Sequence, residues 1–104
     1  MAGIGETSVA ATFERDYGCT ESEWQRWLPD AVHGHPLEHL AADRACVAIG
    51  AGRLDLSWQV AAPRVIALVS LPRLLVRFSF TGVPDTDRAL FLRGFDLRTQ
   101  RGGG

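Results

Sequence analysis

The sequence predicts a small α+β domain, in which a meander of about four antiparallel strands carries an N-terminal and a C-terminal helix on one face. The strands are predicted from residues 53–81, where two runs of alternating apolar and polar residues flank a more fully apolar run, with prolines between them. The helices are predicted from residues 19–28 and 85–93, which combine capping residues with apolar residues at helical spacing.

Length and composition indicate one globular domain spanning residues 1–104. The chain is 46% hydrophobic and 22% charged, within the ordinary globular range. Residues 1–8 and 101–104 are rich in small residues and are predicted to be flexible ends. A domain of this size builds one core of marginal stability, so we expect a homo-oligomer or another protein partner.

The charge is nearly balanced overall but not along the chain. The net charge of −1 argues against a general polyanion binder such as a nucleic-acid-binding protein. Residues 1–62 carry nine acids and four arginines, a balance of −5, and residues 63–104 carry seven arginines and three aspartates, a balance of +4. All eleven basic residues are arginine. Codon bias is the preferred explanation; the alternative is a site that grips carboxylates or phosphates.

The cysteines and the apolar runs predict a cytoplasmic protein with no membrane partner. Cys19 and Cys46 lie far apart and form no CxxC motif, which is typical of buried thiols in a reducing compartment. The N-terminus lacks the basic region and long apolar run of a secretory signal. The longest apolar-rich run, from Val65 to Val76, is interrupted by polar residues and proline and is too short to span a bilayer as a helix.

The first predicted elements are an edge strand and an amphipathic helix. The strand lies within residues 9–17, where VAATF precedes the charged residues 14–16. Thr20 and Glu23 then form a capping box. Apolar residues follow on one helix face: Trp24, Trp27 and Leu28. Pro29 disfavours helical geometry in the residue before it and is predicted to end the helix there.

The next stretch predicts a loop, a second short helix and a hairpin. In residues 30–44, Pro36 fits the first position of a helix. The apolar residues of this short helix share a face: Leu37, Leu40 and Ala41. The strand-like runs CVAIG and RLDLSWQV then flank Gly50-Ala51-Gly52, which predicts a β-hairpin.

Three strands are predicted within residues 53–81, with turns at 61–64 and 71–73. The inward-facing residues of the first and third are Leu54, Leu56, Trp58, Val60, Leu74, Val76, Phe78 and Phe80. The middle run, VIALVSL, is apolar on both faces and therefore predicts a central or helix-covered strand. The third strand turns an outward face with Arg73, Leu75, Arg77 and Ser79 away from the core.

A C-terminal helix is predicted after the break at residues 82–84. Asp85 fits the N-cap, and Gly94 in left-handed geometry would close the helix after Arg93. A competing interpretation makes residues 89–99 a fifth strand; the helix is favoured.

One group of residues has the composition of a metal site. His33, His35 and His39 form an H-x-H-x3-H cluster, and imidazoles four residues apart on a helix can share a metal ion. Pro36 lies between the second and third histidines, and a polar loop without a metal is the favoured interpretation.

A second group predicts an interaction face on the outward side of the third strand. It consists of Arg73, Leu75 and Arg77, with an exposed leucine between two cations. Phe78 and Phe80 alternate with these arginines and so fall on the opposite face, which disfavours stacking on single-stranded nucleic acid. Cross-strand pairing on a solvated surface is the favoured role of the arginines. The alternative is a face that is covered by a partner or by a second copy of the chain.

The chain ends with Arg101-Gly102-Gly103-Gly104. This end resembles the exposed Gly-Gly terminus of ubiquitin-like modifiers and sulfur carriers, a resemblance that implies a carrier protein adenylated at its terminal carboxylate. The predicted order of strands and helices departs from the β-grasp pattern of those families.

Taken with these patterns, the sequence favours a small binding or interaction domain that is not an enzyme. It shows no nucleophile–base pair, strong metal spacing or cofactor loop, and no cofactor is expected. The alternative is a small enzyme or ligand-binding protein with a pocket between helix and sheet. That pocket would be lined by Trp24, Trp27 and Trp58, with Arg77 or a histidine as its polar group.

Overall fold

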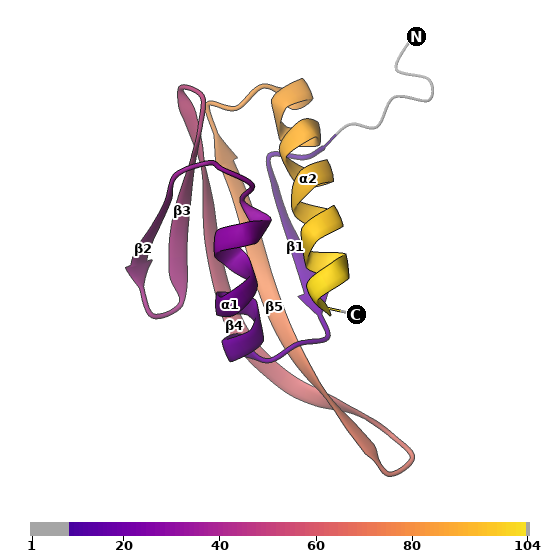
Figure 1. Ribbon diagram of the computed structural model, residues 1–104. Helices are drawn as coiled ribbons and strands as arrows, with labels where there is room; N and C mark the ends of the chain where they lie inside the picture. The colour runs from indigo at the N-terminus through magenta and orange to yellow at the C-terminus, as the bar shows by residue number, and fades with distance from the viewer. Residues whose placement is uncertain (1–8, 104) are drawn as a thin grey trace, which may run out of the picture.

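A computed structural model describes residues 9–103, with side chains described through residue 100. Five antiparallel strands form one sheet, and two helices cover one of its faces (Figure 1). The elements are β1 (Thr12–Tyr17), α1 (Glu21–Ala31), β2 (Leu37–Ala41), β3 (Arg44–Ile49), β4 (Gly52–Ile66), β5 (Val69–Thr81) and α2 (Asp85–Gly103). The strand order is β1-β5-β4-β3-β2. The predicted α+β class and the helix at each end are confirmed, with five strands in place of about four.

One apolar core fills the space between the sheet and both helices. The inward residues of β4 and β5 predicted from alternation are buried: Leu54, Leu56, Trp58, Leu74, Val76, Phe78 and Phe80. Phe95 of α2 joins the layers, with its ring centroid 5.6 Å from that of Phe78 and 5.9 Å from that of Trp24 in α1. Val60 was predicted to face inward but is 68% exposed, although Leu74, its direct partner on β5, is fully buried. The cover over this face therefore ends between these two strands at that level.

Helix α1 begins as predicted and ends later. The Thr20 hydroxyl accepts a hydrogen bond from the Glu23 amide at 3.1 Å, and the Glu23 carboxylate accepts one from the Thr20 amide at 2.9 Å. The predicted end before Pro29 is wrong, since the helix continues to Ala31. Pro29 lies in the last turn, where its missing N–H removes a single bond. The Val32 amide still donates to the Leu28 carbonyl at 3.1 Å.

The sheet edges are formed by β1 and β2. The predicted N-terminal edge strand is confirmed, although it starts at Thr12 and includes the charged residues 14–16. The short helix predicted after Pro36 is wrong, because residues 37–41 form β2 and pair with β3. A helix of one turn nucleates poorly, whereas an available strand edge satisfies the same backbone groups. Proline, which lacks an N–H, is tolerated at the start of an edge strand.

The β4–β5 hairpin corrects three predictions. Residues 61–64 and 71–73 are not turns: the two strands pair from Arg53 opposite Thr81 to Ile66 opposite Val69, with an irregularity in β4 between Ala61 and Arg64. This bulge leaves residues unpaired locally, so the strands pass through their prolines without ending. The run 65–71 is therefore not a central or helix-covered strand but the far end of the hairpin.

Helix α2 is confirmed over the strand alternative for residues 89–99, but its predicted end at Arg93 is wrong. Gly94 is not a left-handed cap and lies inside the helix. A Cβ atom at this position would lie 2.8 Å from Nε2 of His33, so any larger residue would force that ring to shift. Residues 101–103 belong to α2, whereas the flexible ends predicted at residues 1–8 and Gly104 lie outside the described residues.

Candidate interaction arm and outer sheet face

The far ends of β4 and β5 leave the body of the domain as a two-stranded arm, defined here as residues 60–73 (Figure 1). β3 pairs with β4 only up to Ser57, and β1 pairs with β5 only from Leu74 onward. Within residues 9–103, the strands of the arm therefore pair only with each other. Both of its edges carry backbone groups that face away from the ladder.

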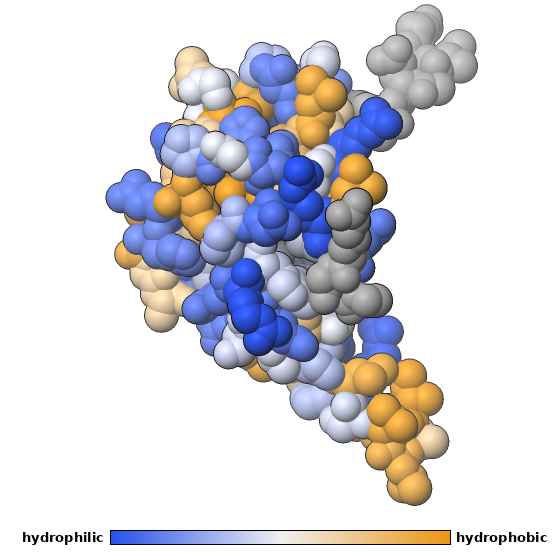
Figure 2. All heavy atoms as spheres, in the orientation of Figure 1, coloured by the Kyte–Doolittle hydropathy of each residue, from blue (hydrophilic) through white to orange (hydrophobic). Residues whose placement is uncertain are grey.

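The arm exposes a set of large apolar side chains. They are Val60, Val65, Ile66, Leu68, Val69 and Leu71. Their exposed fractions run from 42% for Leu71 to 101% for Leu68, which stands at the turn. Figure 2 shows this apolar surface gathered at the end of the arm, beyond a body whose surface is mostly hydrophilic in the same view.

The turn of the arm consists of Ala67 and Leu68. Ala67 has a φ of 55°, in the left-handed region that glycine, asparagine and aspartate occupy more readily than alanine. The turn therefore holds a mild strain, and it presents the Leu68 side chain fully to solvent.

The two faces of the arm differ in composition. Directly paired residues share a face, so Ile66 and Val69 lie together, and Leu71 lies on the same face two residues along β5. We call this the outer face, because it continues along β5 on the side of the sheet turned away from the helices. Val65 and its partner Ser70 lie on the opposite face.

Charged residues surround the base of the arm and are absent from residues 65–71. Asp16 of β1 accepts hydrogen bonds from the Arg73 guanidinium, with Nη2 at 2.7 Å and Nε at 3.0 Å from Oδ2. Arg64 Nη2 lies 4.0 Å from the same oxygen. The hydrogen bonds from Arg73 lower the pKa of Asp16. The arm is thus fixed to the body by ion pairs at its base and apolar at its tip.

The predicted interaction face lies along the outer face of β5. Arg73, Leu75 and Arg77 follow Val69 and Leu71 in steps of two residues, so the apolar arm and the predicted face form one continuous strip. Arg77 borders two hollows of about 270 and 230 Å³, and Ser57 borders both as well. Glu14 of β1 is directly paired with Arg77 of β5. The strip is therefore apolar at the arm and carries charges of both signs where it reaches the body.

The three predicted pocket tryptophans lie in or beside the core. Trp24 and Trp58 are buried with ring centroids 5.7 Å apart, and Trp27 packs against the core from its rim. The Trp58 indole donates to Glu21 at 2.9 Å, whereas Nε1 of Trp24 is buried without a partner among the described residues. Arg77 is exposed on the outer face, opposite the side where Trp24 packs. The ligand pocket remains a prediction.

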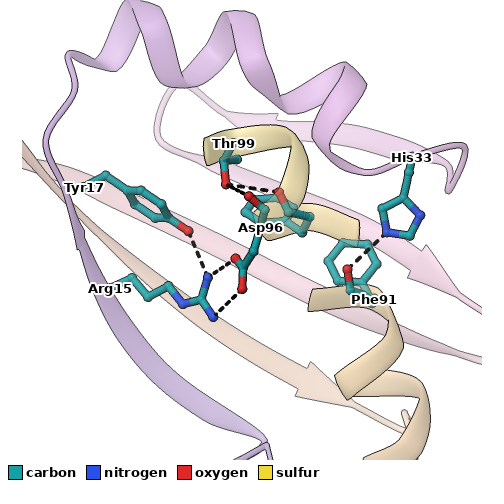
Figure 3. Close-up of polar contacts among 7 residues, drawn as sticks. Arg15, Tyr17, His33, Phe91, Asp96 and Thr99 are labelled. Atoms are coloured by element: carbon teal, nitrogen blue, oxygen red, sulfur yellow. Dashed lines mark hydrogen bonds and ion pairs between the residues drawn. The ribbon is translucent and has the colours of Figure 1, made fainter. Parts of the chain in front are cut away.

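The structure brings two of the three predicted metal-binding histidines together. The rings of His33 and His35 are 5.0 Å apart, while His39 lies on β2. His33 takes a left-handed backbone with a φ of 38°, and its Nε2 donates to the Phe91 carbonyl at 3.1 Å (Figure 3). Within residues 9–100, no three His, Cys, Asp or Glu side chains are grouped so that they could hold a metal ion. His33 joins the end of α1 to α2.

A further polar contact, which the sequence pattern did not predict, joins β1 to α2. Arg15 forms an ion pair with Asp96, with Nη2 donating to Oδ2 at 3.2 Å, and its Nη1 lies 3.4 Å from the Tyr17 hydroxyl (Figure 3). The two charged side chains are each about one-third exposed. They fasten the edge strand to the C-terminal helix.

The two cysteines are free thiols. Cys19, which lies just before the N-cap of α1, is buried, and this burial raises the pKa of its thiol to about 11. Cys46 is half-buried on β3, and burial also raises its pKa. Neither thiol is therefore activated as a nucleophile.

Comparisons with models of protein families, with curated proteins and with solved structures find no match to this chain. In the part of the chain that the structure describes, no helix combines the length and apolar character needed to cross a membrane.

Proposed function

We propose that this protein is a non-enzymatic binding domain that docks on a protein partner through its arm. The exposed, uncharged run from Val65 to Leu71 carries this proposal. Apolar side chains gathered on a projecting element mark interaction sites in proteins of this size. A hairpin of two strands is also only marginally stable in water without a third strand or a packed layer, so a partner that covers the arm would stabilise it.

A protein suits the arm better than a nucleic acid or a lipid. The tip has no cation to contact phosphate, because Arg64 and Arg73 lie at the base and face Asp16. A lipid hydrocarbon layer would leave the backbone groups at both strand edges without hydrogen bonds, at a cost of several kcal/mol each. A protein surface can cover the apolar side chains and leave these edges to water or to its own polar groups.

We propose a cytoplasmic location for this domain. The supporting observation is the pair of free thiols, since a half-buried thiol such as Cys46 persists most readily in a reducing compartment. The Gly-Gly carrier alternative and the tryptophan-lined pocket stay predictions.

The test is site-specific photo-crosslinking in cells that express the protein naturally. A photoreactive amino acid replaces Leu68 at the tip, and a matched variant carries it at Leu90, which is also exposed but lies on α2. We expect discrete protein adducts from position 68 and none from position 90. Equal labelling at both positions, or no protein adduct at position 68, would contradict the proposal.

A further inference from the structure

We infer that the partner is a second copy of this chain, and that two arms pack outer face against outer face about a two-fold axis. This inference rests on the proposed docking role of the arm and names its occupant. Three side chains make the contact on each copy: Ile66 and Val69, which are directly paired, and Leu71, which follows on the same face.

The charge pattern suits pairing of the arm with itself. A two-fold contact places each patch against its own copy, so the patch must be compatible with itself. Residues 65–71 contain no charged residue, and the net charge of each chain is only −1. The rim at the base carries both signs, because Asp16 lies between Arg64 and Arg73. Two copies therefore meet without like-charge repulsion at the centre.

The strand edges favour packing through faces over pairing through edges. Pro63 and Pro72 stand where the arm joins the body and have no N–H to donate to an added strand. Two hairpins that pack face to face form a two-layered unit of four strands. Such a unit has the packed layer that a single hairpin needs in order to be stable in water.

The size of the contact sets the expected strength. The outer face of the arm offers three exposed apolar residues, Ile66, Val69 and Leu71, far fewer than the 20–30 residues a side of a standard interface. The dimer should therefore be concentration-dependent, with monomer recovered on dilution.

The chain offers a matched pair of variants for the test. Val65 and Val69 have the same side chain and similar exposed fractions, 68% and 54%, but lie on opposite faces of the arm. Sedimentation velocity of the purified full chain is measured over a concentration series for the natural protein, Val69→Asp and Val65→Asp, with circular dichroism as the check on folding. We expect a monomer–dimer equilibrium in the natural protein, weakened by about tenfold or more in Val69→Asp and unchanged in Val65→Asp. Leu71→Ser is the second outer-face variant if Val69→Asp fails to fold.

Three results would overturn the inference. One is a dimer that persists in both outer-face variants, and another is a dimer weakened equally by the Val65 substitution. The third is a monomer at every concentration. If that monomer still gives adducts with a different protein from position 68, the binding function stands and only the second copy is excluded. If it instead co-sediments with phosphatidylcholine–phosphatidylserine vesicles in an arm-dependent way, both proposals fall.

Discussion

The body of the domain and its arm are built from the same two strands and differ in what covers them. Along β4, Leu54, Leu56 and Trp58 are at most 3% exposed, while Val60, the next residue in the alternation, is 68% exposed. The far ends of both strands extend past the two helices (Figure 1). The same alternating pattern thus produces a core where a second layer is present and an exposed apolar surface where it is absent. Substitutions should therefore affect stability in the body and association in the arm.

The largest effect is expected at the centre of the body. Phe95 is fully buried, and its ring meets those of Trp24, Phe78 and Phe91 at centroid distances of 5.6–5.9 Å. Phe95→Ala removes these contacts and leaves a cavity, so it should lower the free energy of unfolding by about 3–5 kcal/mol. Urea denaturation of dilute protein measures this loss. A loss below that of any arm variant would break the distinction between body and arm.

The next effect tests the packing between α1 and α2. Alanine in place of glycine inside a helix normally stabilises it by up to about 1 kcal/mol. At Gly94 the added Cβ would lie 2.8 Å from the His33 ring, so Gly94→Ala should destabilise the protein by about 1–3 kcal/mol.

The control for this effect is the same substitution in a His33→Ala background, where the ring is absent. There Gly94→Ala should become neutral or stabilising, as thermal and urea denaturation of the four proteins of the cycle would show. A destabilisation of equal size in both backgrounds would mean that another neighbour fills the space.

A smaller effect is expected at the start of α1. Thr20→Ala removes the hydroxyl that accepts from the Glu23 amide, so it should lower the free energy of unfolding by about 1 kcal/mol. Thr20→Ser keeps that hydroxyl and serves as the control, with the natural stability expected within error in urea denaturation. Equal losses in the two variants would show that the methyl group matters and the cap does not.

The smallest effect on stability, and the sharpest contrast with the body, is expected at the arm tip. Leu68 is fully exposed and lies in the turn between Ile66 and Val69, so Leu68→Asp should change the free energy of unfolding of the monomer by less than about 0.5 kcal/mol while weakening association, by less than Val69→Asp does. Urea denaturation at high dilution and sedimentation at high concentration separate the two outcomes. Leu68→Asp that unfolds the body would show that the arm supports the core.

The elements that are determined by neighbouring residues in the sequence could be predicted from the sequence. The capping box at Thr20 and the inward alternation of Leu74, Val76 and Phe78 depend on local chemistry, and both are present in the structure. Residues 37–41 were assigned the wrong element, because the strand edge of β3 that recruits them is contributed by another part of the chain. Gly94 was assigned to a helix end for a related reason. The ring that lies close to it belongs to His33, which follows α1 and is distant from Gly94 in the sequence.

The arm was missed because its turn carries no glycine, asparagine or aspartate. Ala67 and Leu68 look like the middle of an apolar strand, and Pro63 and Pro72 look like turns. A signal was nevertheless present: the two prolines are placed symmetrically about the true turn, as expected for a hairpin with a proline in each strand. Whether an apolar strand is buried also depends on how far the helices extend over it. The sequence of the strand itself does not contain that information.

The same two prolines have a consequence for how the protein behaves when crowded. An exposed run such as Val65–Leu71, rich in β-branched residues and free of charge, is the kind of segment from which cross-β fibrils grow by adding strands at an edge. Prolines at 63 and 72 remove donors from both edges of the hairpin, so a fibril seeded at the tip could not extend its ladder into the body. Their positions should confine the growth of such a ladder to the arm.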